Sequence, residues 1–200
     1  MFSVFFKGLP VFINREHNKL DLIGKQNINR LVERCKKGNK SAQYHLYLLY
    51  SDSMFSVCKR YIDNQADAEE VLQDSFVKAF DNIKKLRENE KFGGWLKKIT
   101  INQCLNFLQK RKMIFENYET VNESETDLNT SFKESVAFES ETINKAVEAL
   151  PDGCRTILNL YLMEDYKHKE IAKMLNISES TSKSQYRRAL QLLKTKLTVK

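Results

Sequence analysis

Apolar residues recur every three or four positions along almost the whole chain from Ile28 onward, which is the spacing that places them on one face of a helix. Alternating β-branched residues, which would indicate strands, are absent. The sequence has only two prolines and six glycines to interrupt helices. Amphipathic helices are expected over residues 28–35, 42–62, 68–80 and 95–108. The pattern predicts an all-α fold.

The third of these helices begins with a capping signal. Asp67 and Glu70 form a D-x-x-E variant of the capping box, with Asp67 as the N-cap residue. The apolar face of the helix then includes Ala68, Leu72 and Phe76. Its opposite face is left polar and acidic.

The helical pattern stops between residues 114 and 140, where Glu, Asn, Ser and Thr dominate. Such a segment buries too little apolar surface to offset the entropy lost on ordering, so we expect a flexible acidic linker. Helical spacing then returns, with Ile143, Val147 and Leu150 on one face. The chain is therefore expected to hold an N-terminal arm, a small helical domain, the linker and a second small helical domain, at residues 1–27, 28–113, 114–140 and 141–200.

The stretch Glu170–Leu190 has the pattern of two short helices joined by a tight turn. Asn176 tolerates the left-handed backbone that such a turn needs, and Ser178 can cap the second helix by accepting a backbone N–H. The second helix buries Ala189 and keeps a basic, hydroxyl-rich face. This is a helix-turn-helix signature, in which the second helix reads DNA. An ordinary helical hairpin with a solvated basic face is the alternative.

The charge distribution supports an anionic partner. The 200 residues carry a net charge of +7, from 33 Lys and Arg against 26 Asp and Glu. Both expected helical domains are basic, whereas the linker holds seven acidic residues and one basic residue.

Cysteine and histidine usage gives no sign of a metal site, and we expect no cofactor. Cys35, Cys58, Cys104 and Cys154 lie far apart among apolar residues, which favours reduced, buried thiols. The three histidines have no ligand-like spacing.

The N-terminal run MFSVFFKGLPVF is apolar but brief, contains Lys7 and lacks a cleavage site, so it is not interpreted as a signal peptide. It would be a disordered arm, a docking arm or the result of a start-site error. Apolar runs are too short to span a membrane, and a cytoplasmic protein is expected.

Two blocks together carry a family resemblance. The segments NQADAEEVLQDSFVKAFDNI and FGGWLKKITINQCLNFLQKRK closely resemble region two of bacterial sigma factors. The segment ALPDGCRTILNLYLMEDYKHKEIAKMLNISESTSKSQYRRALQLLK resembles region four. The short two-domain form resembles an extracytoplasmic-function (ECF) sigma factor of the sigma-seventy family. The resemblance implies a non-enzymatic protein that brings core RNA polymerase to promoters, melts the minus-ten element and reads the minus-thirty-five element.

The resemblance also implies which residues contact the polymerase. In the family, the polar face of the helix around residues 67–74 binds the clamp helices of the β′ subunit, and the β flap is a second polymerase contact. The matching residues here are Glu69, Glu70, Gln73 and Asp74. The alternative is that these residues form a solvated acidic face near a helix N-terminus.

The minus-ten surface is expected around the loop RENEKFGG and the helix after it. In the family this loop forms the pocket for a flipped base, and Asn102 matches a base-contacting position. Unstacked bases need hydrogen-bonding groups, and their phosphates need cations. The expected residues are Asn102, Asn106, Lys97, Lys98 and Arg111. Trp95 is a possible stacking residue, but its position beside Leu96 favours a core role.

The minus-thirty-five contacts are expected on the reader helix at Lys183, Ser184, Gln185, Arg187 and Arg188. Two residues depart from the family pattern. Ser182 replaces an apolar residue that normally packs inward. Gln185 replaces a cation, and it would either lose a phosphate contact or gain a base contact to adenine.

The remaining expectations concern partners and rivals. In the family, the linker occupies the basic RNA exit channel, and an anti-sigma factor commonly holds the protein; a plain solvated tether is the alternative for the linker. No small-molecule substrate is expected. The rival functions are a helix-turn-helix regulator that does not bind core polymerase and an enzyme such as a nuclease. The first would need a sensor domain and the second a catalytic cluster, and neither pattern occurs in the sequence.

Overall fold

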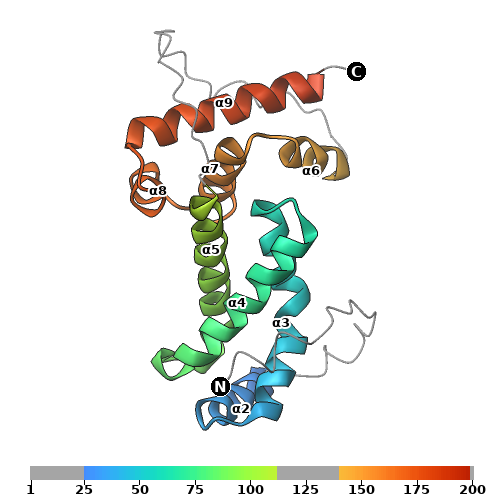
Figure 1. Ribbon diagram of the computed structural model, residues 1–200, viewed down its shortest axis with the longest axis vertical. Coiled ribbons are helices and arrows are strands. Elements are labelled where there is room, and N and C mark those ends of the chain that lie inside the picture. Colours follow the sequence, from blue (N-terminus) through green and yellow to red (C-terminus); the bar gives the residue numbers. More distant parts are fainter. Residues whose placement is uncertain (1–24, 112–139, 199–200) are drawn as a thin grey trace. The chain divides into compact units, whose positions relative to one another are not determined.

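The computed structural model describes residues 25–111 and 140–198. All regular structure within these ranges is helical (Figure 1), so the predicted all-α fold is confirmed. The chain divides into two compact units after Arg111. Residues 1–24 of the predicted arm (1–27) and residues 114–139 of the predicted linker (114–140) lie outside the described residues. No helix in the described ranges is long and apolar enough to cross a membrane.

Apolar helix faces build the first unit, with α4 packed against α3 and α5, and α2 packed against α3. Leu46, Leu72 and Leu96 are fully buried between these helices. Burying a side chain of this size stabilises the fold by roughly 1.5–3 kcal/mol. The elements in chain order are α2 (Lys25–Lys36), α3 (Lys40–Tyr61), α4 (Gln65–Asn82), the short 3₁₀ turns η2 (Ile83–Lys85) and η3 (Asn89–Lys91), and α5 (Phe92–Lys110).

The start of α4 differs from the predicted capping box. The N-cap is Asn64, whose side-chain oxygen accepts the backbone N–H of Asp67 at 3.1 Å. Asp67 instead lies in the first turn, where its carboxylate pairs with Arg111 at 2.9 Å. The prediction of Asp67 as N-cap was therefore wrong. Asn64 is an equally good capping residue, and the Asp67 side chain is drawn away by a cation near the end of α5.

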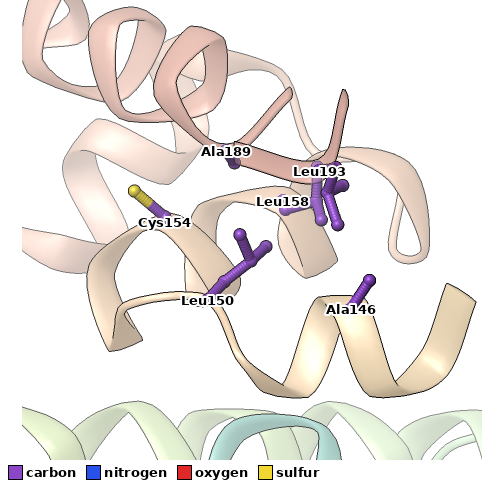
Figure 2. Packing of buried hydrophobic residues seen from close by; sticks show 6 residues of the cluster. All are labelled: Ala146, Leu150, Cys154, Leu158, Ala189 and Leu193. Atoms are coloured by element: carbon purple, nitrogen blue, oxygen red, sulfur yellow. The ribbon is translucent and has the colours of Figure 1, made fainter. Parts of the chain in front are cut away.

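The second unit contains α6 (Ser140–Glu148), α7 (Asp152–Leu162), α8 (His168–Leu175) and α9 (Glu179–Thr198). Helix α9 contacts the other three. Figure 2 shows apolar side chains from α6, α7, α9 and the turn between α6 and α7 meeting in one cluster, and these are Ala146, Leu150, Cys154, Leu158, Ala189 and Leu193. Ile143 was expected on this face but is 40% exposed, because Ala146 occupies the inward position of α6 instead.

A buried arginine joins α6 to α7. The Arg155 side chain is only 2% exposed and donates to the Glu148 carbonyl oxygen and to the Asp152 carboxylate, both at 2.7 Å. A buried guanidinium needs such partners, because an unpaired charge away from water is costly. These contacts hold the turn between α6 and α7 in place.

Candidate nucleic-acid interface

The turn between α8 and α9 has the geometry that the sequence predicted. Asn176 adopts a left-handed backbone conformation, with φ 55° and ψ 47°. The Ile177 N–H donates to the Ala172 carbonyl at 3.0 Å and closes the turn. Ser178 then caps α9, because its hydroxyl oxygen accepts the Thr181 N–H at 2.9 Å. The predicted helix-turn-helix is confirmed at the level of its backbone.

The N-terminal half of α9 presents two exposed cations, Lys183 and Arg187. Lys183 pairs with Glu179 one turn earlier at 2.8 Å, and both side chains are about half exposed. Such a surface pair is worth little in water, so the ammonium group remains exchangeable with an incoming phosphate. Ser184 and Arg188 are partly buried, and the Ser184 hydroxyl donates to the Thr181 carbonyl at 3.0 Å.

Gln185 does not lie on this surface. It is only 4% exposed, and its side-chain oxygen accepts a hydrogen bond from the Cys154 thiol at 3.0 Å. This position does not support the expected contact of Gln185 with a base, because a side chain directed into the core is turned away from a groove, whereas it is compatible with the alternative that a phosphate contact has been lost. Position 185 lies one turn before Ala189 and faces the same interior.

Ser182 also faces inward, as the residue that it replaces does in the family. It is fully buried, and its hydroxyl lies 2.9 Å from Nδ1 of His168, the first residue of α8. The His168 ring stacks on Tyr161 of α7, with centroids 4.5 Å apart, and meets Tyr186 of α9 edge to face. Sequence reasoning missed this cluster, because its members come from three helices.

The charged groups that act on His168 belong to the reader helix α9. Burial lowers the pKa of His168 below its ordinary value, and the positive charges of Lys183 and Arg187 lower it further, while Glu179 acts in the opposite direction. The protonation of the imidazole therefore depends on Lys183 and Arg187, the same two cations that are exposed on α9.

The residues expected to contact polymerase lie on one strip of α4. Glu70 and Asp74 are exposed, one turn apart, while Glu69 and Gln73 are half-buried. Glu69 also accepts a hydrogen bond from Gln65 at 2.9 Å. We call these four residues, Glu69, Glu70, Gln73 and Asp74, the acidic strip. Their spacing makes them one contiguous polar surface opposite the buried face of α4.

The residues expected to contact the minus-ten element are only partly brought together. Asn102, Asn106 and Lys98 are exposed on α5, and Lys97 is half-buried. Arg111 is engaged within the protein, because its guanidinium pairs with Asp67 and lies 4.7 Å above the Phe107 ring. Asn102 and Asn106 are one helical turn apart and therefore share a face.

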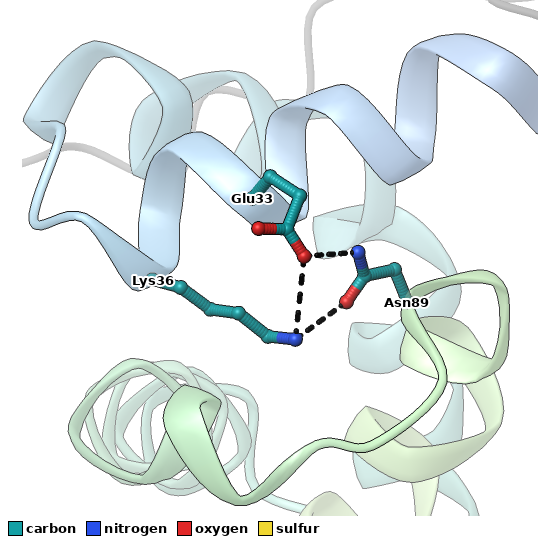
Figure 3. Close-up of polar contacts among 3 residues, drawn as sticks. All are labelled: Glu33, Lys36 and Asn89. Carbon is teal, nitrogen blue, oxygen red and sulfur yellow. Dashed lines mark hydrogen bonds and ion pairs between the residues drawn. The ribbon is translucent and has the colours of Figure 1, made fainter.

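The loop before α5 is held by a contact that the sequence did not reveal. Asn89, in η3, donates its amide to the Glu33 carboxylate at 2.5 Å and accepts from the Lys36 ammonium at 2.7 Å (Figure 3). The hydrogen bond from Asn89 is the main cause that lowers the pKa of Glu33, and the charge of Lys36 adds to it. Both partners belong to α2, so this helix fixes the position of the loop.

The start of α5, which directly follows η3, is closely packed against α3. A Cβ atom at Gly93 would come within 2.9 Å of the Tyr50 ring, so only glycine lets α3 approach here without a shift. Leu96 is fully buried, as predicted. Trp95 is only half-buried and packs its ring near that of Phe92, 6.1 Å between centroids, so it lies at the edge of the core.

Within the described residues, side chains that can bind metals do not form a metal-binding group and the cysteines are not bridged. Within residues 25–111 and 140–198, no three His, Cys, Asp or Glu side chains are grouped closely enough to hold a metal ion. All four cysteines are buried and unbridged, which confirms their interpretation as structural thiols.

Comparison with known proteins matches both units of the chain to one protein family. The family model for Sigma-70 region 2 matches residues 46–113, and that for Sigma-70 region 4 matches residues 140–193. The RNA polymerase sigma factor SigV of Bacillus subtilis is 30% identical over 174 residues, covering 87% of this chain and 95% of that protein. The ECF RNA polymerase sigma factor SigW of the same organism is 28% identical over 182 residues, covering 85% and 96%.

Among solved structures, CnrH in complex with the cytosolic domain of CnrY aligns at 18% identity, covering 85% of this chain and 96% of that chain, with a TM-score of 0.45. The two matched regions occur in the order of the two units, and the relatives match over most of their length. The chain therefore belongs to the sigma-70 family of RNA polymerase sigma factors and is an ECF-type member.

Proposed function

We propose that this sigma factor directs core RNA polymerase to specific promoters, with the first unit docking on the polymerase and melting the minus-ten element, and the second unit reading the minus-thirty-five element. The observation that carries the proposal is the capped reader helix α9, whose exposed cations Lys183 and Arg187 lie in its N-terminal half. This is the end of a recognition helix that contacts base edges and phosphates.

The proposed minus-thirty-five contacts are Lys183, Ser184, Arg187 and Arg188, without Gln185. Lys183 and Arg187 are exposed and supply the charge that phosphates or guanine edges attract. Ser184 is partly buried and its hydroxyl donates to the backbone. Its proposed role is a contact made close to the helix surface, because its side chain is short. Base reading therefore rests mainly on the two exposed cations and on Arg188.

The proposed roles in the first unit follow from charge. The acidic strip on α4 would dock on basic clamp helices of β′, with Glu70 and Asp74 as its exposed centre. Asn102 and Asn106 would meet unpaired bases, and Lys97 and Lys98 would hold the phosphates beside them. Arg111 has a smaller proposed part, because it already pairs with Asp67.

The remaining proposals concern partners and organisation. We infer that the second unit also contacts the β flap, that an anti-sigma factor holds the protein, and that it acts in the cytoplasm as a transcription initiation factor without a catalytic role. The functional domains are proposed at residues 28–113 and 141–200, joined by the linker at 114–140. Helix α2 begins at Lys25, slightly before the first of these boundaries.

A reconstituted transcription assay tests the function. The purified chain is mixed with bacterial core RNA polymerase and a promoter library, and run-off transcripts are sequenced. We expect transcripts that start downstream of a common pair of elements only when the chain is present. Co-purification with core enzyme is measured in parallel. DNA binding by the chain without core binding or transcription would indicate the rival helix-turn-helix regulator.

A further inference from the structure

The inference begins with the hydroxyl of Ser182, which is buried where the family pattern has an apolar residue. The side chain is fully inaccessible, so its hydroxyl depends on a partner within the protein. That partner is Nδ1 of His168 at 2.9 Å. The pair connects the first residue of α8 to the reader helix, in addition to the turn at Asn176.

The His168 ring is held on more than one side. Tyr161 of α7 stacks on it, with centroids 4.5 Å apart and planes 15° apart. Tyr186 of α9 lies 5.5 Å away at a steep angle and also contacts Tyr161 at 4.6 Å. The imidazole on α8 is therefore held in its orientation by side chains of α7 and α9.

Charged groups around His168 come mainly from the reader helix. Lys183 and Arg187 disfavour a positive imidazole, and Glu179 favours it. Lys169, on the same helix as His168, adds a further positive charge in this neighbourhood through its effect on Glu179. From α7 the facing group is the phenol of Tyr161. The cations therefore outnumber the single carboxylate.

We propose that His168 is a positioning residue of the reader helix and that it couples DNA binding by this helix to the uptake of a proton. The proposal rests on the proposed role of α9 as the reader of promoter DNA. The hydrogen bond to Ser182 survives both charge states, because a serine hydroxyl can donate to a neutral Nδ1 or accept from a protonated one. Protonation therefore changes the local charge without releasing the helix.

The sign of the coupling follows from the phosphates. In the free protein, burial together with Lys183 and Arg187 holds the pKa of His168 below its ordinary value. Phosphates bound to these two cations offset their repulsion and attract the imidazolium, so the pKa rises in the complex. Because the complex binds the proton more tightly, affinity for DNA increases as the pH falls from the bound-state pKa toward the free-state pKa. The gain is about tenfold for each unit by which DNA raises the pKa.

Proton NMR of the full chain provides the direct test. The chain has only three histidines, and the C2–H resonance of His168 is assigned by its loss in His168→Asn. The resonance is titrated with and without a short mixed-sequence DNA duplex at low salt, because phosphate contacts do not depend on sequence. We expect the His168 pKa to rise with the duplex. An unchanged pKa, while the amide signals of Lys183 and Arg187 shift, would overturn the inference but leave the proposed DNA-reading function intact. If the duplex shifts no signals in the second unit, both fail.

Variants separate positioning from simple loss of structure. His168→Asn keeps a group that can bond Ser182 but cannot titrate, so we expect near wild-type affinity at neutral pH and a flat pH profile. Ser182→Ala removes the bond and should weaken duplex binding at every pH. His45→Asn, at an exposed histidine on α3, is the matched control and should keep the wild-type profile. A wild-type pH profile in His168→Asn would contradict the proposal, and so would wild-type affinity in Ser182→Ala.

Discussion

Asn89 and Glu33 lie 56 positions apart in the sequence, yet the Asn89 amide donates to the Glu33 carboxylate at 2.5 Å. Asn89 belongs to the loop that the family resemblance predicts to form the pocket for a flipped minus-ten base, and Glu33 belongs to α2. Lys36, on the same helix, completes the contact through the Asn89 side-chain oxygen. This loop is thus fixed from outside the segment that would contact DNA, which leads to the first prediction.

Asn89→Ala is expected to slow promoter melting while the fold is kept, because the loop loses its attachment to α2 but the core is untouched. The measurement is the rate of open-complex formation by holoenzyme containing the variant. Lys91→Ala is a matched control, because Lys91 is exposed in the same 3₁₀ turn and pairs only locally with Glu88 among the contacts described. Wild-type melting rates in Asn89→Ala would contradict the positioning role.

The same contact predicts a pH dependence of folding. The pKa of Glu33 is lowered in the folded protein, chiefly by Asn89. A lowered carboxyl pKa stabilises the fold above the ordinary value of 4.5, and this stabilisation is lost as the pH falls through the folded-state pKa. The stability difference between wild type and Asn89→Ala should therefore be present at neutral pH and shrink in acid. Urea unfolding at a series of pH values measures it, and a difference that persists unchanged at low pH would count against this linkage.

The acidic strip gives a prediction about polymerase binding. Reversing Glu70 and Asp74 to lysine should sharply reduce affinity for core enzyme, because like charges would then face each other across the proposed contact. Circular dichroism should show unchanged helix content, since exposed substitutions usually alter stability by no more than about 0.5 kcal/mol. The control is reversal of Asp63 and Asp81, which changes net charge equally at exposed sites outside the strip. Equal losses in both variants would mean that only total charge matters.

Asn102 gives a prediction about the melting step. Asn102→Ala should impair open-complex formation more than closed-complex binding, because its exposed amide can bond an unpaired base only after the strands separate. Permanganate reactivity of unpaired thymines reports melting, and a gel-shift assay under non-melting conditions reports closed binding. Gln109→Ala, at an exposed position of the same helix, is the control. Normal thymine reactivity in Asn102→Ala rules out the assigned role.

Local features were predictable from the sequence because their causes are local. The turn at Asn176 depends on one residue that tolerates a positive φ, and the cap at Ser178 depends on a hydroxyl next to the helix start. The buried faces of α4 and α5 likewise follow from helical spacing. Each of these outcomes is decided within a few residues along the chain.

Features that depend on distant partners were missed. The sequence pattern predicted Asp67 as the cap of α4, whereas Asn64 caps the helix and Arg111 engages Asp67 from beyond the end of another helix. The contacts of Asn89 and His168 also require the tertiary fold. The case of Gln185 is different, because its spacing from Ala189 already pointed inward. There the family pattern suggested a DNA contact, and the helical phase would have been the better guide.

The burial of Gln185 leads to the last prediction, which contrasts it with Arg187, two residues later and on the other side of the helix. Gln185→Ala leaves the Cys154 thiol without its acceptor and opens space in the core, so we expect the free energy of unfolding to fall by about 1–3 kcal/mol. The preference among minus-thirty-five sequences should not change.

Arg187→Ala should leave stability nearly unaltered. If Arg187 holds a phosphate, its loss should weaken binding to all sequences about equally and reduce the salt slope by about one unit. If it reads a guanine, the loss should instead fall on one base pair and cost about 1–3 kcal/mol there.

The measurements for this pair are urea unfolding of the full chain and holoenzyme activity across a minus-thirty-five library at two salt concentrations. Gln191→Ala is the matched control for Gln185→Ala, because it removes the same side chain from an exposed position of α9. It should change neither stability nor sequence preference. A shifted preference at one base pair in Gln185→Ala, with normal stability, would show that Gln185 leaves the core to read DNA. If Gln185→Ala loses stability but keeps its sequence preference, Gln185 is a packing residue, although it departs from the family pattern. Sequence discrimination would then depend on the residues that α9 exposes at its surface.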